Sequence, residues 1–158
     1  MDTKDIQKAH GHWILAKMGK RVLRPGGKEL TKKLIDSLAF NASDDVVEFA
    51  PGMGFTASLT LAHKLHSYVG IDADEDIVRM LSKKLQSAQA SFNLGNASQT
   101  NLKSASKDKV YGEAMLTMHA DHRKSEIIRE AHRILKKGGW YAIHELGLTN
   151  VDETLKSK

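Results

Sequence analysis

The chain has 158 residues, of which 41% are hydrophobic and 27% are charged. This size and composition are typical of one globular domain with a sizeable core, and they exclude collagen-like, disordered and disulfide-stapled classes. The sequence contains no cysteine, which excludes thiolate metal sites and cysteine nucleophiles. No apolar run approaches the ~20 residues of a membrane span, and no signal-peptide pattern opens the sequence. We therefore expect a cytoplasmic protein with no membrane span.

The net charge of +5 is concentrated near the N-terminus. Residues 1–33 hold nine Lys or Arg and three Asp or Glu, which gives +6, so the remainder of the chain carries −1. A basic segment can favour anionic partners such as nucleic acid, phosphates or a membrane surface. A solvated terminus is the simpler interpretation. Because nucleic-acid binding would rest on this segment alone, we do not expect it.

Hydrophobic periodicity predicts helices and strands that alternate along the chain. In chain order, the expected elements are a helix at 28–39, a strand at 46–50, a helix at 55–65, a strand at 67–72, a helix at 74–88, a strand at 90–94, a strand starting at 109–111, a helix at 125–135 and, after a turn at 136–139, a strand at 140–146. Leu30 and Ile128 are expected on inward helix faces, and Trp140 is expected to pack inside. Alternation of this kind predicts an α/β fold with a parallel sheet covered by helices on both faces.

The first expected strand-to-helix turn contains two glycines, Gly52 and Gly54, which follow Ala50 and Pro51. Glycines at such a turn let the backbone pass close to a ligand and leave the N–H groups of the next helix free. A strand, a glycine turn and a helix in this order are typical of a nucleotide-type site at the carboxyl edge of a parallel sheet. The Gly-x-Gly spacing alone also fits a tight turn that binds nothing.

Asp72 ends the second expected strand, 18 residues after Gly54. A carboxylate at this position can accept hydrogen bonds from both ribose hydroxyls of an adenosine group. The alternative is that Asp72 caps the helix expected at 74–88. Together with the glycine turn, the position favours ribose binding.

These features resemble the class I S-adenosylmethionine-dependent methyltransferases, specifically the small-molecule branch typified by quinone-biosynthesis enzymes. The resemblance covers roughly residues 20–147 and rests on five motifs in order. They are Glu48 with Ala50, Gly52 and Gly54; Gly70-Ile71-Asp72; Gly95-Asn96-Ala97; Asp108-Lys109-Val110 with Leu116; and Leu135-Lys136-Lys137-Gly138-Gly139. Each motif is modest evidence alone, but five at suitable spacing are strong.

The resemblance implies that the chain binds S-adenosylmethionine and transfers its methyl group to a small-molecule acceptor by in-line displacement. Glu48 is expected to support the turn or bind the amino group, and Asp72 to bind the ribose. The residues implied to bind the cofactor are Glu48, Ala50, Pro51, Gly52, Gly54, Asp72, Ala73, Asn96, Ala97, Glu113 and Met115. Of these, Ala73, Asn96 and Ala97 would flank the adenine, and Glu113 and Met115 would line the methionine side.

Two positions depart from the family pattern. Ala50 replaces the first glycine, which is tolerable if its φ is negative. Asn96 replaces the usual aspartate near the adenine, where an amide oxygen can still accept a hydrogen bond but carries no charge.

The resemblance also indicates missing elements, because family members continue with a helix and an antiparallel strand pair and only residues 147–158 follow the fifth strand. The expected fold is therefore a Rossmann-like methyltransferase sheet without its last antiparallel strand pair, and the chain looks like a truncated member or a fragment. We expect a basic N-terminal arm or lid at 1–27, a cofactor-binding domain at 28–147 and a tail at 148–158. The uncovered fifth strand would present an open edge through which a homodimer could form.

The histidines give no clear catalytic or metal site. His63 and His66, like His119 and His122, are three residues apart, but neither pair has a metal-binding pattern or a third ligand, so we expect no metal. His119 lies at the expected substrate rim and is a weak candidate for a general base. Otherwise the catalytic residue is unknown.

Two alternative functions stay open. Gly52-x-Gly54-x-x-Ala57 with Asp72 also fits the fingerprint of a nicotinamide- or flavin-dependent oxidoreductase. A truncated chain could also bind the cofactor, or a partner chain, without turnover.

Overall fold

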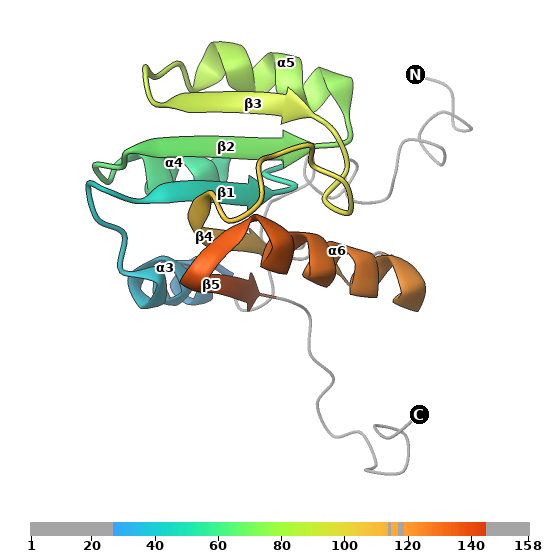
Figure 1. Cartoon of the computed structure of the whole chain (residues 1–158). Helices are drawn as coiled ribbons and strands as arrows, with labels where there is room; N and C mark the ends of the chain where they lie inside the picture. The colour runs from blue at the N-terminus through green and yellow to red at the C-terminus, as the bar shows by residue number, and fades with distance from the viewer. Residues whose placement is uncertain (1–26, 114, 117–118, 145–158) are drawn as a thin grey trace, which may run out of the picture.

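In the computed structural model, the described residues form five strands: Asp45–Phe49 (β1), Ser67–Asp72 (β2), Ala90–Leu94 (β3), Lys107–Glu113 (β4) and Leu135–His144 (β5). The structure describes residues 27–113, 115–116 and 119–144. The strands form one sheet in the order β3-β2-β1-β4-β5, and every neighbouring pair is parallel (Figure 1). This confirms the predicted α/β class. All strands end at the same side, which we call the carboxyl edge, and all begin at the opposite amino edge.

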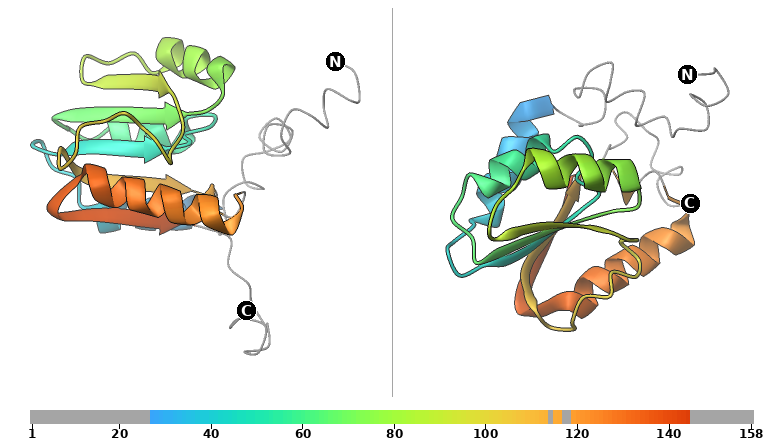
Figure 2. Two further views of the ribbon diagram at one scale, coloured as in Figure 1. Left: turned by 45° about the vertical axis from the view of Figure 1, so that its right-hand side comes forward. Right: turned by 90° about the horizontal axis from the view of Figure 1, so that it is seen from above.

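Among the described residues, four helices cover the sheet from both sides (Figure 2, right). Helices Gly27–Leu38 (α3), Phe55–Leu61 (α4) and Glu75–Lys84 (α5) lie on one face, and Asp121–Ile134 (α6) lies on the other. Each face has its own core. Leu34, Leu38, Ala57, Ile77 and Leu81 pack on the three-helix face. Phe49, Val110, Ile127, Ala131 and Ile134 pack on the α6 face.

The central strand β1 is buried on both faces, so helices must cover both sides of the sheet. Val46 and Glu48 point to the three-helix face, whereas Val47 and Phe49 point to the α6 face, and all four are buried. A strand buried on both faces lies at the centre of a covered parallel sheet, and a continuous apolar run is its sequence signature. The loop that follows β1 is therefore held at the middle of the carboxyl edge.

Several predicted details are wrong. Trp140, Ile128 and Leu30 do not pack inside: their exposed fractions are 69%, 46% and 39%. Trp140 lies on the edge strand β5, where no neighbouring strand covers it among the described residues. Helix α6 begins at Asp121 rather than at residue 125, and α4 and α5 end before residues 65 and 88.

The fifth strand is longer and less regular than predicted. Lys107 pairs with Leu135, but Lys109 pairs with Trp140, so residues 136–139 lie opposite Asp108 alone. Gly138 adopts a φ of 84° within this stretch. The predicted turn is therefore present as an irregularity inside β5.

The arm predicted at 1–27 lies outside the described residues except for Gly27, and so does the tail predicted at 148–158. Within the described ranges, no helix has the length and apolar character that a membrane crossing requires.

Candidate functional site at the carboxyl edge

The β1–α4 loop turns sharply by means of three residues with positive φ. Ala50, Gly52 and Gly54 have φ values of 53°, 59° and 86°. The condition under which alanine is easily tolerated here, a negative φ, is therefore not met. Its N–H donates a 2.7 Å hydrogen bond to Ile71 O of β2, which fixes where the chain must leave the sheet. The left-handed conformation costs an alanine about 1–2 kcal/mol, so this loop is strained at its first position.

The two glycines of the loop serve different purposes. A Cβ added to Gly54 would lie 2.5 Å from Leu81 Cδ2, so this glycine lets the loop pack against α5. A Cβ on Gly52 would meet nothing within 4 Å. Gly52 therefore borders open space, where its backbone is accessible to a ligand.

Asp72 joins this loop to the end of β2. Its Oδ2 accepts a 3.3 Å hydrogen bond from the N–H of Gly52, and its Oδ1 accepts a 3.0 Å bond from the N–H of Asp74. The alternative role as a helix cap belongs instead to Asp74, which accepts hydrogen bonds from the N–H groups of Asp76 and Ile77. The structure thus brings the predicted acid and the predicted glycine turn into direct contact.

The loop after β3 completes this part of the edge. The N–H of Gly95 donates to Asp72 O at 2.9 Å, which places the following Asn96 and Ala97 next to the end of β2. Asn96 is exposed and pairs with Gln99, and Ala97 packs against the α6-face core. Ala73 is exposed beside Asp72.

A buried carboxylate anchors the far end of the same loop. Glu130 of α6 accepts hydrogen bonds from the N–H and the hydroxyl of Thr100 at 2.6 and 2.7 Å. Arg133 also donates to Glu130, at 2.6 Å. The hydrogen bond from Arg133 and those from Thr100 outweigh the effect of burial and lower the pKa of Glu130 to about 2. The carboxylate therefore stays ionised and ties the loop to α6.

Glu48 lies beneath the loop, fully inside the three-helix face. It accepts hydrogen bonds from the hydroxyls of Tyr68 at 2.6 Å and Tyr111 at 2.9 Å. Burial, together with the charges of Glu113 and Asp72, raises the pKa of Glu48 to about 8, although the two tyrosine bonds oppose the shift. These contacts brace β1 between β2 and β4. Contact of Glu48 with a cofactor's amino group stays a prediction.

Glu113, at the end of β4, makes hydrogen bonds with side chains of three other elements. It accepts hydrogen bonds from the hydroxyls of Thr31 in α3, at 2.7 Å, and Thr56 in α4. His144 Nδ1 at the end of β5 lies 2.7 Å from its Oε2. Sequence reasoning missed Thr31, Thr56 and His144. The only signal for His144 was a polar residue near the end of an apolar strand.

The other predicted site residues lie nearby but in different settings. Pro51 is buried in the β1–α4 loop. Met115 is buried in the α6-face core. His119 is exposed just before α6, and its N–H donates to Leu116 O at 3.0 Å. The cofactor and substrate roles of these residues stay predictions.

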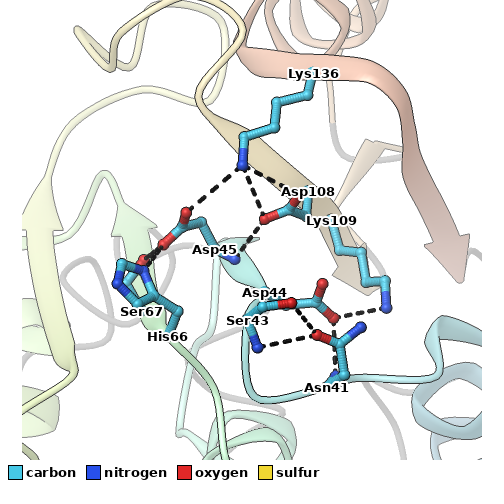
Figure 3. A network of polar contacts seen from close by, with 9 residues as sticks. All are labelled: Asn41, Ser43, Asp44, Asp45, His66, Ser67, Asp108, Lys109 and Lys136. Carbon is cyan, nitrogen blue, oxygen red and sulfur yellow. Dashed lines mark hydrogen bonds and ion pairs between the residues drawn. The ribbon is translucent and has the colours of Figure 1, made fainter.

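The amino edge carries a separate polar network of nine side chains (Figure 3). Lys109 Nζ lies 2.7 Å from Asp44 Oδ2, and both side chains are mostly buried. His66 Nδ1 lies 2.6 Å from Asp45 Oδ1, and Lys136 Nζ reaches Asp108 at 3.3 Å. Burial raises the pKa of Asp45, but hydrogen bonds from His66 and Ser67 lower it more, so the net shift is downward. His66 is thus engaged far from the carboxyl edge.

Comparison with known proteins places this architecture in a family. The model of the methyltransferase domain family matches residues 47–143. An uncharacterized protein of Haemophilus influenzae is 34% identical over 147 residues, which cover 90% of this chain and 58% of that protein. The chain thus spans a little over half the length of this relative.

Solved structures share the fold at lower identity. A SAM-dependent methyltransferase from Methanosarcina mazei matches 69% of this chain and 55% of its own, with 23% identity and a TM-score of 0.62. Phosphoethanolamine N-methyltransferase 1 from Haemonchus contortus, solved with phosphoethanolamine and S-adenosylhomocysteine, matches 78% of this chain and 27% of its own, with 19% identity and a TM-score of 0.66. Because the family model spans more than half of the sequence, the chain belongs to the methyltransferase domain family.

Proposed function

We propose that the chain binds S-adenosylmethionine at the carboxyl edge and transfers its methyl group to a small-molecule acceptor, as enzymes of the quinone-biosynthesis branch do. The observation that carries this proposal is the hydrogen bond between the Gly52 N–H and Asp72 Oδ2, in a loop whose Gly52 borders open space. The family match favours methyl transfer over the nicotinamide alternative.

The residues present suit this cofactor. The open backbone at Gly52 would admit the methionyl part, and the Asp72 carboxylate would accept from the ribose hydroxyls. Asn96 and Ala97 would border the adenine on the loop that Gly95 joins to β2. When bound, the cofactor supplies an electrophilic methyl group on a positively charged sulfur. The carboxylates of Asp72 and Glu113 at this edge suit such a cation, whereas Glu48, with a pKa of about 8, is largely protonated at neutral pH.

The contribution of the protein to the reaction is mainly alignment. Holding an acceptor and a methyl group in attack geometry converts a bimolecular encounter into an intramolecular one and removes several kcal/mol from the barrier. The loops after β1, β2 and β3 are fixed to one another and to α6, so the cofactor side of this geometry is prepared in advance.

Calorimetry with S-adenosylhomocysteine tests the proposal. Wild-type protein is expected to bind it, and Asp72→Ala is expected to lose at least ~10-fold in affinity, because hydrogen bonds to a charged group contribute ~1.5–3 kcal/mol each. Asp76→Ala removes an exposed acid from the next helical turn and is expected to bind like the wild type. Tight binding of NADH without any binding of S-adenosylhomocysteine would overturn the assignment.

We also propose that the chain self-associates through β5. This strand lies at the edge of the sheet and, among the described residues, pairs only with β4. It exposes Trp140 and Ile143, and an exposed apolar edge strand recruits another strand. Sedimentation at micromolar concentration should show a dimer, and Ile143→Lys should weaken it while the far-UV spectrum stays native-like. A clean wild-type monomer with a cooperative melt would contradict this proposal.

A further inference from the structure

Glu113 and His144 are paired positions at the ends of β4 and β5, so their side chains leave the sheet on the same face. With Thr31 of α3 and Thr56 of α4 they form a group that we call the histidine cluster. The side chain of Glu113 is 7% exposed and that of His144 is 11% exposed. Helices α3 and α4 thus hold Glu113 of β4, and Glu113 holds the imidazole ring of β5 at the carboxyl edge.

The hydrogen bonds of the cluster fix where its protons lie. Two threonine hydroxyls donate to Glu113, and the 2.7 Å contact of Thr31 with Oε2 is shorter than its 3.3 Å contact with Gly27 O. An ionised carboxylate only accepts hydrogen bonds. The Nδ1 of His144 must therefore carry the proton that it shares with Glu113 Oε2. In the neutral ring this leaves a lone pair on Nε2.

No described residue donates a hydrogen bond to that lone pair. Nε2 of His144 is buried and makes no hydrogen bond among the residues that the structure describes. A buried polar atom without a partner costs about 1–3 kcal/mol, and native proteins retain few of them. Thr56, which fixes the other side of Glu113, is the second residue of α4 and follows the glycine loop directly. The histidine cluster thus adjoins the glycine loop of the proposed cofactor site.

We propose that His144 is the general base of the methyl transfer, that Glu113 positions it, and that the acceptor atom is a hydroxyl oxygen; this inference rests on the proposed function. The O–H bond of the acceptor breaks as its O–CH3 bond forms. The proton passes to Nε2 of His144, and the electron pair of the broken S–CH3 bond stays on sulfur. Nε2 then releases the proton to water after the product leaves.

A general base such as the His144 imidazole benefits some methyl acceptors more than others. A neutral amine already has a free lone pair, and a thiol, with an ordinary pKa near 8.5, ionises in part unaided. A phenol, with an ordinary pKa near 10, stays protonated at neutral pH, so it gains most from an adjacent base. The carboxylate of Glu113 stabilises the imidazolium that forms. Glu48 of β1 also interacts electrostatically with Glu113, and Lys28 of α3 lies over the ring of Phe55, the residue before Thr56.

Nitrogen NMR of the full chain labelled at histidine tests the proton assignment without cofactor. Wherever the ring is neutral, His144 should carry its proton on Nδ1 and not on Nε2, with its signals identified by their loss in His144→Asn. A ring protonated at Nε2 alone would overturn the proposal. Adding phenol in the presence of S-adenosylhomocysteine should shift the Nε2 signal, because the hydroxyl then donates to it.

Methylation assays test the catalytic role. With substituted phenols as probes, His144→Ala should lose at least ~100-fold in kcat, while its affinity for S-adenosylhomocysteine stays within about twofold. Added imidazole should restore part of the activity, which a purely structural role would not allow. His132→Asn, at an exposed position of α6, is the matched control and should behave like the wild type.

The outcomes separate this inference from the proposed function. If the wild type does not bind S-adenosylhomocysteine, the proposed function fails, whereas the NMR result still reports on the histidine. If the wild type binds it but methylates only thiols or amines, or no probe, the general-base assignment is wrong. Retention of phenol methylation by His144→Ala would contradict it equally.

Discussion

The two edges of the sheet both gather acidic side chains, but they stabilise them in different ways. At the amino edge, Asp44 and Asp108 lie beside lysines, and Asp45 lies beside a histidine. At the carboxyl edge, the described partners of Glu48 and Glu113 are tyrosine and threonine hydroxyls and one histidine. The first edge is a neutralised structural network. At the second edge, the pKa of about 8 keeps Glu48 largely protonated at neutral pH, so Glu113 and Asp72 supply the negative charge for a cationic ligand.

The largest effect on stability should come from breaking the amino-edge network. In Lys109→Met, the buried carboxylate of Asp44 loses the ammonium group that lies 2.7 Å away. Removing one partner of a buried ion pair costs roughly 3–5 kcal/mol, which urea unfolding would measure. Lys124→Met, which removes the partner of an exposed aspartate in α6, should leave stability nearly unchanged. Equal effects of the two variants would show that the amino edge is not held by charge pairing.

Glu48→Gln tests the charge state of the carboxyl edge. Because the pKa of Glu48 is about 8 in the folded protein and near 4.5 when unfolded, the folded state binds more protons between these values. This group therefore lowers stability as pH rises from about 5 to about 8, by on the order of 3 kcal/mol. Glu48→Gln should lack this part of the pH dependence in urea unfolding. The exposed Glu75→Gln should retain it, and identical profiles for both variants would be the contrary result.

Alanine substitutions at the two glycines of the β1–α4 loop should differ in stability, because only Gly54 packs against another element. Gly54→Ala places a Cβ against Leu81 in a left-handed conformation and should destabilise the fold by roughly 2–4 kcal/mol. Gly52→Ala meets no neighbour and should cost only roughly 1–2 kcal/mol. Thermal or urea unfolding gives both values. If the two variants are equally unstable, the contact with Leu81 does not explain the choice of Gly54.

The smallest effect concerns the strain at Ala50. Because this exposed residue has a φ of 53°, Ala50→Gly should raise stability by up to about 1 kcal/mol, after the greater chain entropy of glycine is subtracted. Urea unfolding would show this gain. A clear loss of stability would mean that the loop does not hold Ala50 in a left-handed conformation.

The centre of the sheet was predictable because β1 and β2 are largely apolar and are bounded by polar residues. The expected strands at 67–72 and 90–94 agree residue for residue with β2 and β3. The start of α6 was missed because Asp121, His122 and Arg123 are exposed and give no apolar periodicity. Trp140 was misplaced because residue type does not reveal that a strand lies at the edge of a sheet.

The site was predictable only where short sequence patterns indicate it. Gly52, Gly54 and Asp72 follow local patterns, and the structure brings them together. The histidine cluster depends on side chains from four elements, and no spacing in the sequence relates Thr31 to Glu113 across 82 positions. The φ of Ala50 was equally hidden, because it depends on where the Ile71 carbonyl lies in the finished sheet.

The strand order also sets the sequence of events during synthesis. The central strand β1 pairs on one side with β2, which follows soon after it, and on the other with β4, which ends at Glu113. A nascent chain can therefore assemble β1, β2 and β3 while the second edge of β1 still lacks its partner. Until Tyr111 emerges from the ribosome, Glu48 has one tyrosine instead of two, and an apolar strand edge stays open. Co-translational folding should thus pass through a half-sheet that is prone to mispairing.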